Sequence, residues 1–480
     1  MSACRFPLRL CVVAVAVALT ACSTVAPYQP PKVEVPAHYA ADTPSNTAWQ
    51  IASPADAAPR GAWWTVFGDT ELNTLEARID VSNQSVRKAL ANLDEARAGT
   101  DYQRAGFLPT ITAGVAQDRY RTSANKQGSS LAGKTIPDYS LGVTATWEPD
   151  VFGRIRDEVT SASASAQASA ADLEAVRLSM TAQLAVDYFN LRSLDAQRHL
   201  LDDSVSAYAR ALKILQDQQR NGAIDASAVA QAQTQLDSTR TQARDIDVNR
   251  AQLQHAIATL IGEPASIFSL PPLQDTQDSF HLPAIPPGLP SQLIERRPDI
   301  AAAERRVAAA NAQIGVAHAA FFPNLVLSAT AGLESSFFMP WLSAPSLFWS
   351  LGPQLVGTLF DGGKRSATLH AATAHYDGTV ADYRQTVLTA FEQVENNLSA
   401  LQALADESTT QQRAAQSAQQ ALQLTTNRFN AGAVSYLDVV TSQTIALTNE
   451  RDAVVIEGRR MAACVRLIEA LGGSWSGNAG

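Results

Sequence analysis

The 480-residue sequence has little charge, and its acidic side chains outnumber the basic ones. Charged residues make up 17% of the chain, against roughly 25% in an average soluble protein. The formal net charge is −9, and no long basic run interrupts this balance. A nucleic-acid-binding protein needs a positive surface for the phosphates, so we expect no nucleic-acid partner.

The sequence also lacks long hydrophobic runs, although 46% of its residues are hydrophobic. Each helical membrane span needs about 20 consecutive apolar residues, and the mean hydropathy of the chain is only −0.08. These values exclude a membrane protein built from many hydrophobic helices. Alanine, glutamine, serine and threonine take the place of the missing charge.

The amino terminus has the features of a secretory signal peptide. Two arginines precede a short apolar stretch, residues 10–19, and the tetrapeptide Leu-Thr-Ala-Cys then ends at Cys22. This tetrapeptide resembles the bacterial lipobox, in which the cysteine becomes the lipidated first residue of the mature chain. We predict a signal peptide over residues 1–21 and lipid attachment at Cys22; the alternative is an ordinary signal peptide with an incidental cysteine. Because Ser23 follows in place of aspartate, the resemblance favours the outer membrane.

Cysteine is otherwise scarce, with four residues in the whole chain. Cys4 and Cys11 belong to the predicted signal peptide, so the mature chain keeps the modified Cys22 and Cys464. One free thiol cannot form an internal disulfide, so this exported chain must be stabilised by its core. Cys464 lies at helical spacing from other apolar residues, and we expect it to be a buried, small hydrophobic side chain.

An internal repeat organises the rest of the chain. Gly222 aligns with Gly432 and Gly262 with Gly472, each 210 positions later, and the register shifts slightly upstream. A proline-rich segment separates the two copies. We predict six segments: a signal peptide (1–21), a lipid-anchored arm (22–68), a first repeat (69–270), a linker (271–290), a second repeat (291–473) and a tail (474–480).

Each copy has the same predicted order of helix, strand, loop, strand, long helix, tight turn and long helix. The first helix is predicted over residues 70–105, between a cap at Asp69 or Thr70 and a stop at Pro109, and its counterpart over 298–319. Residues 154–219 contain neither proline nor glycine, and a helix of that length would reach roughly 100 Å. In the last helix apolar residues recur every seven positions, which is typical of a coiled coil.

The predicted strands alternate between an apolar face and a face of small polar residues. Such segments suit the wall of a transmembrane β-barrel, and they equally suit a half-buried sheet of a soluble protein. The lipoprotein signal favours the barrel, with the loops 119–138 and 335–346 outside the cell. The strands are predicted over residues 111–116, 139–147, 325–333 and 349–359.

Four strands per chain cannot close a barrel, and an open edge in lipid leaves backbone N–H and C=O groups unpaired. Several chains must therefore share one barrel. Two chains would give eight strands with an interior filled by side chains, whereas three would give twelve and leave room for a lumen. The helices would then form a coiled-coil tube on the periplasmic side.

Six stretches carry a resemblance to a known family: WEPDVFGR (147–154), LIERRPDI (293–300), FFP (321–323), LFDGG (359–363), RFNAG (428–432) and LDVV (437–440). The chain resembles the TolC/OprM-like outer membrane factors of Gram-negative tripartite pumps, in particular their NodT-type lipoprotein branch. The resemblance implies a mostly α chain of two tandem repeats, whose homotrimer forms a 12-stranded membrane β-barrel on a long α-helical periplasmic tunnel. It also implies two partners, a periplasmic adaptor (membrane fusion) protein and an inner-membrane transporter of the resistance-nodulation-division class.

The resemblance places the periplasmic aperture of the tunnel near the hairpin tips, where acidic side chains ring the opening. Asp438 matches one such acidic position, and Thr441 stands where relatives often carry a second aspartate. Phe429 stands where some relatives have the tyrosine of a closing latch, so that hydroxyl is absent here. Asp225 and Arg428 are the predicted substitutes in the latch. The alternative for Asp438 is a solvated helical aspartate with no role in the aperture.

Both tight turns contain a glycine that can adopt the left-handed conformation which ends a helix. The resemblance implies that the same turns meet the adaptor, and the two roles are compatible. The tip residues are Asn221, Gly222, Ala223, Ala431, Gly432 and Ala433.

No catalytic or metal-binding set stands out. The seven histidines are scattered and form no His-Glu-x-x-His motif, so we expect no enzyme activity, no cofactor and no metal. The prediction is a passive exit duct in the outer membrane for small molecules such as drugs. The alternatives are the exit duct of an ATPase-driven (type I) secretion system and a structural coiled-coil lipoprotein. The sequence does not identify the exported substrate.

Overall fold

The computed structural model describes residues 28–33, 61–125, 130–273, 282–283 and 296–473. The predicted signal peptide and the lipidated cysteine lie outside these residues. The chain divides into two compact units, each assembled from three stretches of sequence. Unit 1 contains residues 1–32, 92–169 and 302–383, and unit 2 contains residues 33–91, 170–301 and 384–480.

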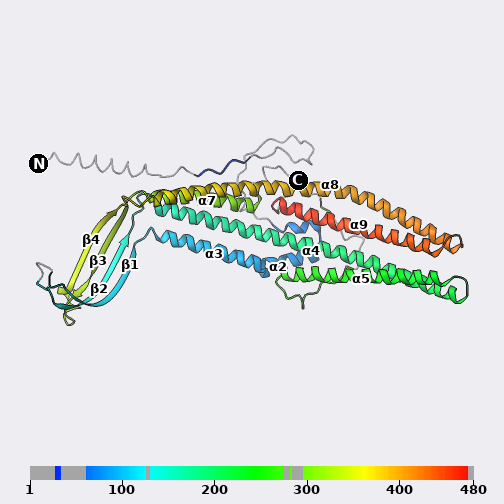
Figure 1. The fold of residues 1–480 in the computed structure, drawn as a ribbon, viewed down its shortest axis with the longest axis horizontal. Coiled ribbons are helices and arrows are strands. Elements are labelled where there is room, and N and C mark those ends of the chain that lie inside the picture. Colours follow the sequence, from blue (N-terminus) through cyan, green and yellow to red (C-terminus); the bar gives the residue numbers. More distant parts are fainter. Residues whose placement is uncertain (1–27, 34–60, 126–129, 274–281, 284–295, 474–480) are drawn as a thin grey trace. The chain divides into compact units, whose positions relative to one another are not determined.

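Unit 1 contains a four-stranded antiparallel sheet (Figure 1). Its strands, in spatial order, are β1 (Thr110–Arg121), β2 (Thr135–Trp147), β3 (Asn324–Ser335) and β4 (Leu347–Val356). All four strands were predicted, but their ends were not. Residues 119–121 and 135–138, which fall in the predicted loop 119–138, continue the first hairpin because their backbones stay paired beyond the apolar alternation. The last strand begins earlier than predicted and ends at Val356 rather than at residue 359.

The register of the sheet gathers the predicted apolar residues on one face. Directly paired residues point to the same side of an antiparallel sheet. Val115 pairs with Leu141, Leu141 with Leu333, and Leu333 with Leu347. The opposite face carries small residues such as Thr144. Among the described strands β1 and β4 each have one neighbour, so both are edges of the sheet.

The helices repeat in length as well as in order. They are η1 (Trp63–Phe67), α2 (Thr70–Ser82), α3 (Gln84–Ala105), α4 (Arg154–Arg220), α5 (Ala226–Leu260), α7 (Pro298–Ala319), η2 (Ala344–Ser346), α8 (Lys364–Asn430) and α9 (Tyr436–Ala470). Helices α3 and α7 have 22 residues each, α4 and α8 have 67 each, and α5 and α9 have 35 each. The prediction of two tandem repeats in a mostly helical chain with four strands is therefore confirmed.

The single helix predicted over residues 70–105 is wrong, because Asn83 divides it into α2 and α3. Asn83 has an extended backbone, with φ −66° and ψ 126°. Its side-chain oxygen accepts from the N–H groups of Ser85 and Val86 at 2.9 and 3.0 Å, which caps α3. Its side-chain amide donates to the carbonyl oxygen of Leu260 at 2.7 Å. These bonds compete with the continuation of the helix and end α2 one residue earlier.

Buried ion pairs in unit 2 hold the end of the first repeat in place. The carboxylate of Asp195 in α4 accepts from Arg192 at 3.0 Å and from Arg250 of α5 at 2.6 Å. Arg192 also donates to the carbonyl oxygen of Pro271 at 2.8 Å, and Arg250 to that of Leu270 at 2.7 Å. The two arginines therefore fasten the chain to α4 and α5 as it enters the proline-rich segment.

Cys464 lies in α9 with 1% of its surface exposed, so the expected role of a small hydrophobic residue is confirmed. Burial raises the pKa of its thiol to about 12, which keeps the thiol protonated at neutral pH. In the part of the chain that the structure describes, no helix combines the length and the hydropathy of a membrane span.

Candidate functional site at the helical hairpin tips

Two tight turns end the hairpins α4–α5 and α8–α9, and both follow one hydrogen-bond pattern. Gly222 and Gly432 have φ values of 77° and 72°, in the left-handed region that glycine adopts without strain. The N–H of Gly432 donates to the carbonyl oxygen of Phe429, and that of Ala433 to Arg428, both at 2.9 Å. The first turn repeats both bonds at 2.9 Å, from Gly222 to Gln219 and from Ala223 to Gln218. All six predicted tip residues are exposed on these well-bonded turns.

Each returning helix begins at a carboxylate close to the turn. In a capping box at the start of α9, the backbone N–H and the hydroxyl of Ser435 donate to the Asp438 carboxylate at 2.9 and 2.7 Å. At the start of α5, Asp225 accepts from the N–H of Ser227 at 2.6 Å. The bonds from Ser435, and then the positive Arg428, lower the pKa of Asp438; the bonds from Ser227 lower the pKa of Asp225. Both carboxylates are therefore charged, and both are exposed.

A hydrophobic cluster joins the two hairpins behind the turns. Phe429 packs edge-to-face against Tyr436, with the ring centroids 5.4 Å apart. The buried members of the cluster come from α4, α5 and α9, and Phe429 adds a contact from α8. In this chain Phe429 is therefore packed against the core of the hairpins. The buried members are Tyr208, Leu212, Leu215, Ala232, Leu236, Tyr436 and Val439.

The predicted aperture residues each serve their own hairpin. Arg428 acts on Asp438 across the α8–α9 turn, whereas Asp225 binds the first turn of its own helix. The hydroxyl of Thr441 donates to a carbonyl of α9 at 2.9 Å. Among the described residues these side chains form no hydrogen bond from one hairpin to the other, and the aperture stays a prediction. We missed Ser435, although its spacing of three residues from Asp438 is a signal for a helix start.

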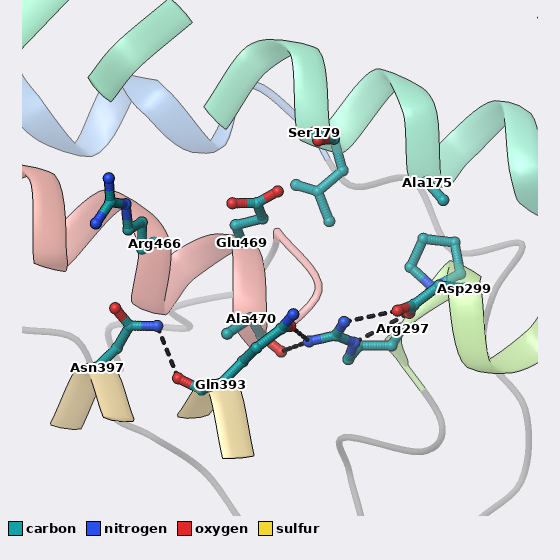
Figure 2. Close-up of a pocket in the computed structure, with 11 residues that line it drawn as sticks. Ala175, Ser179, Arg297, Asp299, Gln393, Asn397, Arg466, Glu469 and Ala470 are labelled. Carbon is teal, nitrogen blue, oxygen red and sulfur yellow. Dashed lines mark hydrogen bonds and ion pairs between the residues drawn. The ribbon is translucent and has the colours of Figure 1, made fainter. Parts of the chain in front are cut away.

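A polar cavity in unit 2 surrounds Arg297, a residue of the stretch LIERRPDI (Figure 2). The Arg297 guanidinium binds the Asp299 carboxylate at 3.0 and 2.6 Å, Gln393 Oε1 at 2.8 Å and the carbonyl oxygen of Ala470 at 3.0 Å. It thereby joins the start of α7, the middle of α8 and the end of α9. Burial raises the pKa of Glu469 on the cavity wall. The cavity of about 390 Å³ is lined by Ala175, Leu178, Ser179, Arg297, Pro298, Asp299, Gln393, Asn397, Arg466, Glu469 and Ala470.

Arg297 and Asp299 bind each other, and the further bonds of Arg297 hold three helices together. Within the described ranges, no cluster of three or more His, Cys, Asp or Glu side chains could hold a metal ion. The hairpin tips therefore remain the better candidate for function, because they combine exposure, fixed geometry and negative charge.

The chain is similar to known proteins over nearly its whole length. The model of the family described as outer membrane efflux protein matches residues 77–263 and 289–473. The cation efflux system protein CusC of Escherichia coli O6:H1 is 30% identical over 470 residues, which are 98% of this chain and 99% of CusC. The pyoverdine export outer membrane protein OpmQ of Pseudomonas aeruginosa is 30% identical over 436 residues, or 90% of this chain and 91% of OpmQ. The solved open state of the MtrE outer membrane channel of Neisseria gonorrhoeae matches with a TM-score of 0.81 and 28% identity, covering 94% of this chain and 98% of that one.

Proposed function

The chain belongs to the outer membrane efflux protein family and is an outer-membrane component of an efflux system, and from this premise we propose that three copies form its channel. Each copy contributes four strands to a shared 12-stranded barrel, and the helices form a tunnel on the periplasmic side. Small molecules pass through it passively, without catalysis or a cofactor. The observation that carries this proposal is a sheet with one apolar face and two unpaired edges.

The unpaired edges make a single copy unsuited to lipid. Among the described strands, β1 and β4 have no partner on their outer sides. In lipid each unpaired backbone group costs several kcal/mol, and pairing β4 of one copy with β1 of the next satisfies both edges. The apolar face supports the same assembly. Trp349 and Leu351 of β4 are 74% and 75% exposed in the single chain, as suits side chains that contact lipid.

We propose that lipidated Cys22 is a second membrane anchor, after loss of residues 1–21. The hydroxyl of Tyr28 donates to Glu304 Oε1 of α7 at 2.7 Å, which attaches the amino-terminal arm to unit 1. Tyr28 follows Cys22 by six residues, a stretch that spans at most about 20 Å. The lipid is therefore held close to the unit that contains the sheet. The same proposal divides the mature chain into an arm (22–68), two repeats (69–270 and 291–473), a linker (271–290) and a tail (474–480).

The hairpin tips are the proposed contact with a periplasmic adaptor protein, which would link the channel to a resistance-nodulation-division transporter. Exposed, well-bonded turns at Gly222 and Gly432 offer a partner a fixed surface. The charge of Asp438 supports a role at the aperture, where three copies around one axis would attract cations. Asp225, Arg428, Thr441 and Phe429 complete the proposed aperture region. The cargo belongs to the small-molecule class, since the relatives are named for cations and for pyoverdine.

Purification and reconstitution of the full chain test the channel. We expect a particle with the mass of three chains in detergent and steady ion currents in planar lipid bilayers. A monomeric particle without current would contradict the proposal and favour the structural coiled-coil lipoprotein.

An experiment in cells distinguishes the efflux channel from the exit duct of a type I secretion system. We expect that deletion of the gene sensitises the cells to small toxic molecules and leaves protein secretion unchanged. Normal susceptibility together with lost secretion of a protein substrate would favour the secretion duct instead.

A further inference from the structure

The two loops that connect the strands differ in chemistry, although the repeats around them are alike. The first loop, residues 122–134, contains two lysines and several serine, threonine and asparagine side chains. The second loop, residues 336–346, contains no charged residue, and none occurs anywhere from Ser335 to Phe360. Because the two loops occupy the same place in their repeats but differ in charge and polarity, we infer that they contact different surroundings.

The second loop exposes its large apolar side chains. Phe337 is 72% exposed, Phe338 65%, Met339 91% and Leu342 67%. Single exposed apolar residues are normal on a protein surface, but a contiguous group of this kind marks a contact with a partner or with lipid.

Ring contacts place this loop on the apolar face of the sheet. Tyr139 of β2 lies on the same face as Leu141, two residues along the strand. Its ring contacts Phe338 at 5.5 Å and Trp341 at 5.8 Å between centroids. The indole N–H of Trp341 donates to the carbonyl oxygen of Leu333 at 3.3 Å. The loop leaves β3 and therefore leans over that strand toward β2, on the side away from the small polar residues.

We propose that residues 336–346 are a membrane contact, seated in the outer surface of the bilayer beside the barrel. The occupant of this surface is lipid, at the level where head groups meet acyl chains. Tyrosine and tryptophan prefer that level because each joins a flat apolar ring to a polar group. The loop continues into the apolar face of β4, and no charged residue occurs from Ser335 to Phe360. This inference rests on the proposed barrel, whose apolar face contacts lipid.

Two other occupants fit the contacts less well. A plug in the channel would have to lie over the small polar face that carries Thr144, whereas the loop packs on Tyr139 of the opposite face. A neighbouring copy would join the sheet at the edges β1 and β4, whereas the loop leans from β3 toward the inner strand β2. Lipid is the occupant that both observations favour.

Spin labels in the reconstituted channel test the inference. Single cysteines are introduced by Met339→Cys in the second loop, Asn125→Cys in the first loop and Leu351→Cys on the apolar face of β4. Asn125 is exposed and serves as the matched control. The chain without an introduced cysteine is the blank, since Cys464 is buried. Each label is measured for collision with oxygen, which concentrates in lipid, and with a water-soluble nickel chelate.

We expect the ratio of oxygen to nickel collisions to be several-fold higher at Met339→Cys and Leu351→Cys than at Asn125→Cys. A lipid-like ratio at Leu351→Cys with a water-like ratio at Met339→Cys would overturn the loop contact and leave the barrel intact. Water-like ratios at both would overturn the barrel as well. A Met339→Cys label that meets neither reagent would show that protein covers the loop, which also contradicts the inference.

Discussion

Replacing Arg297 by alanine should lower the free energy of unfolding through the three helices that its guanidinium joins. Arg297 is 7% exposed, and its removal leaves Gln393 Oε1 and the Ala470 carbonyl oxygen without this donor. An unsatisfied buried polar group costs about 1–3 kcal/mol. The Asp299 side chain is 37% exposed, so water replaces its partner and the loss there is small. Water that enters the cavity forms hydrogen bonds with Gln393 Oε1 and the Ala470 carbonyl oxygen and so reduces their cost. We therefore expect a total loss of about 2–3 kcal/mol in the free energy of unfolding.

Two variants at the same cavity separate this effect from a general loss of charge. Arg466 lines the cavity but is exposed, so Arg466→Ala should change the free energy of unfolding by less than about 0.5 kcal/mol. Arg297→Lys keeps the charge but loses the planar fork that reaches three partners, and we expect an intermediate loss. Denaturant unfolding of the purified protein, followed by helical circular dichroism, measures all three. Equal midpoints for Arg297→Ala and Arg466→Ala would refute the reasoning.

The remaining predictions concern the tips. Asp438→Gln removes the charge but keeps a side chain that can complete the capping box, so cation selectivity in planar bilayers should fall while α9 keeps its start. Asp438→Ala should lose both the cation selectivity and the capping box. The lowered pKa of Asp438 means that its stabilising contribution is present above the unfolded pKa, about 3.9, and is lost only as pH falls through the lower folded value. Wild-type selectivity should therefore persist at mildly acidic pH, and equal selectivity in all three proteins would exclude the aperture role. Gly432→Val forces a branched side chain into the left-handed region, which costs about 1–2 kcal/mol of conformational free energy. We expect faster hydrogen exchange at the tip and reduced drug resistance of the cells. Unchanged exchange and resistance would count against the tip assignment.

The long helices and the repeat could be predicted because their signals are local and occur twice. Residues 154–219 lack proline and glycine, and the 210-residue offset recurs at Gly222 and Gly262. The faces of the strands also followed from alternation, and the register confirms them. The strand ends did not, because residues 117–121 are mostly polar and are held in the ladder by backbone pairing, which hydrophobicity does not report.

The misses share a physical cause, which is dependence on distant partners. Asn83 ends α2 partly through a bond to Leu260, 177 residues away. Arg297 is bonded to groups 96 and 173 residues along the chain. The turn at Gly432 could be predicted from one residue type, whereas the place of Phe429 in a core cluster depends on the other three helices. A single sequence shows the periodicity of apolar residues and the glycine and proline residues that end helices. It does not show which distant groups meet.

The equal lengths of α4 and α8, and of α5 and α9, have an evolutionary consequence. An insertion in one copy alone would give hairpins of unequal length and separate Tyr208 from Tyr436, which share one cluster. Descendants of a duplicated ancestor can therefore change helix length only in matched pairs of mutations. The strand-connecting loops are free of this restriction, and the polar residues 122–134 differ from the apolar residues 336–346. Within one chain, the paired hairpins therefore restrict a change of length far more than the loops do.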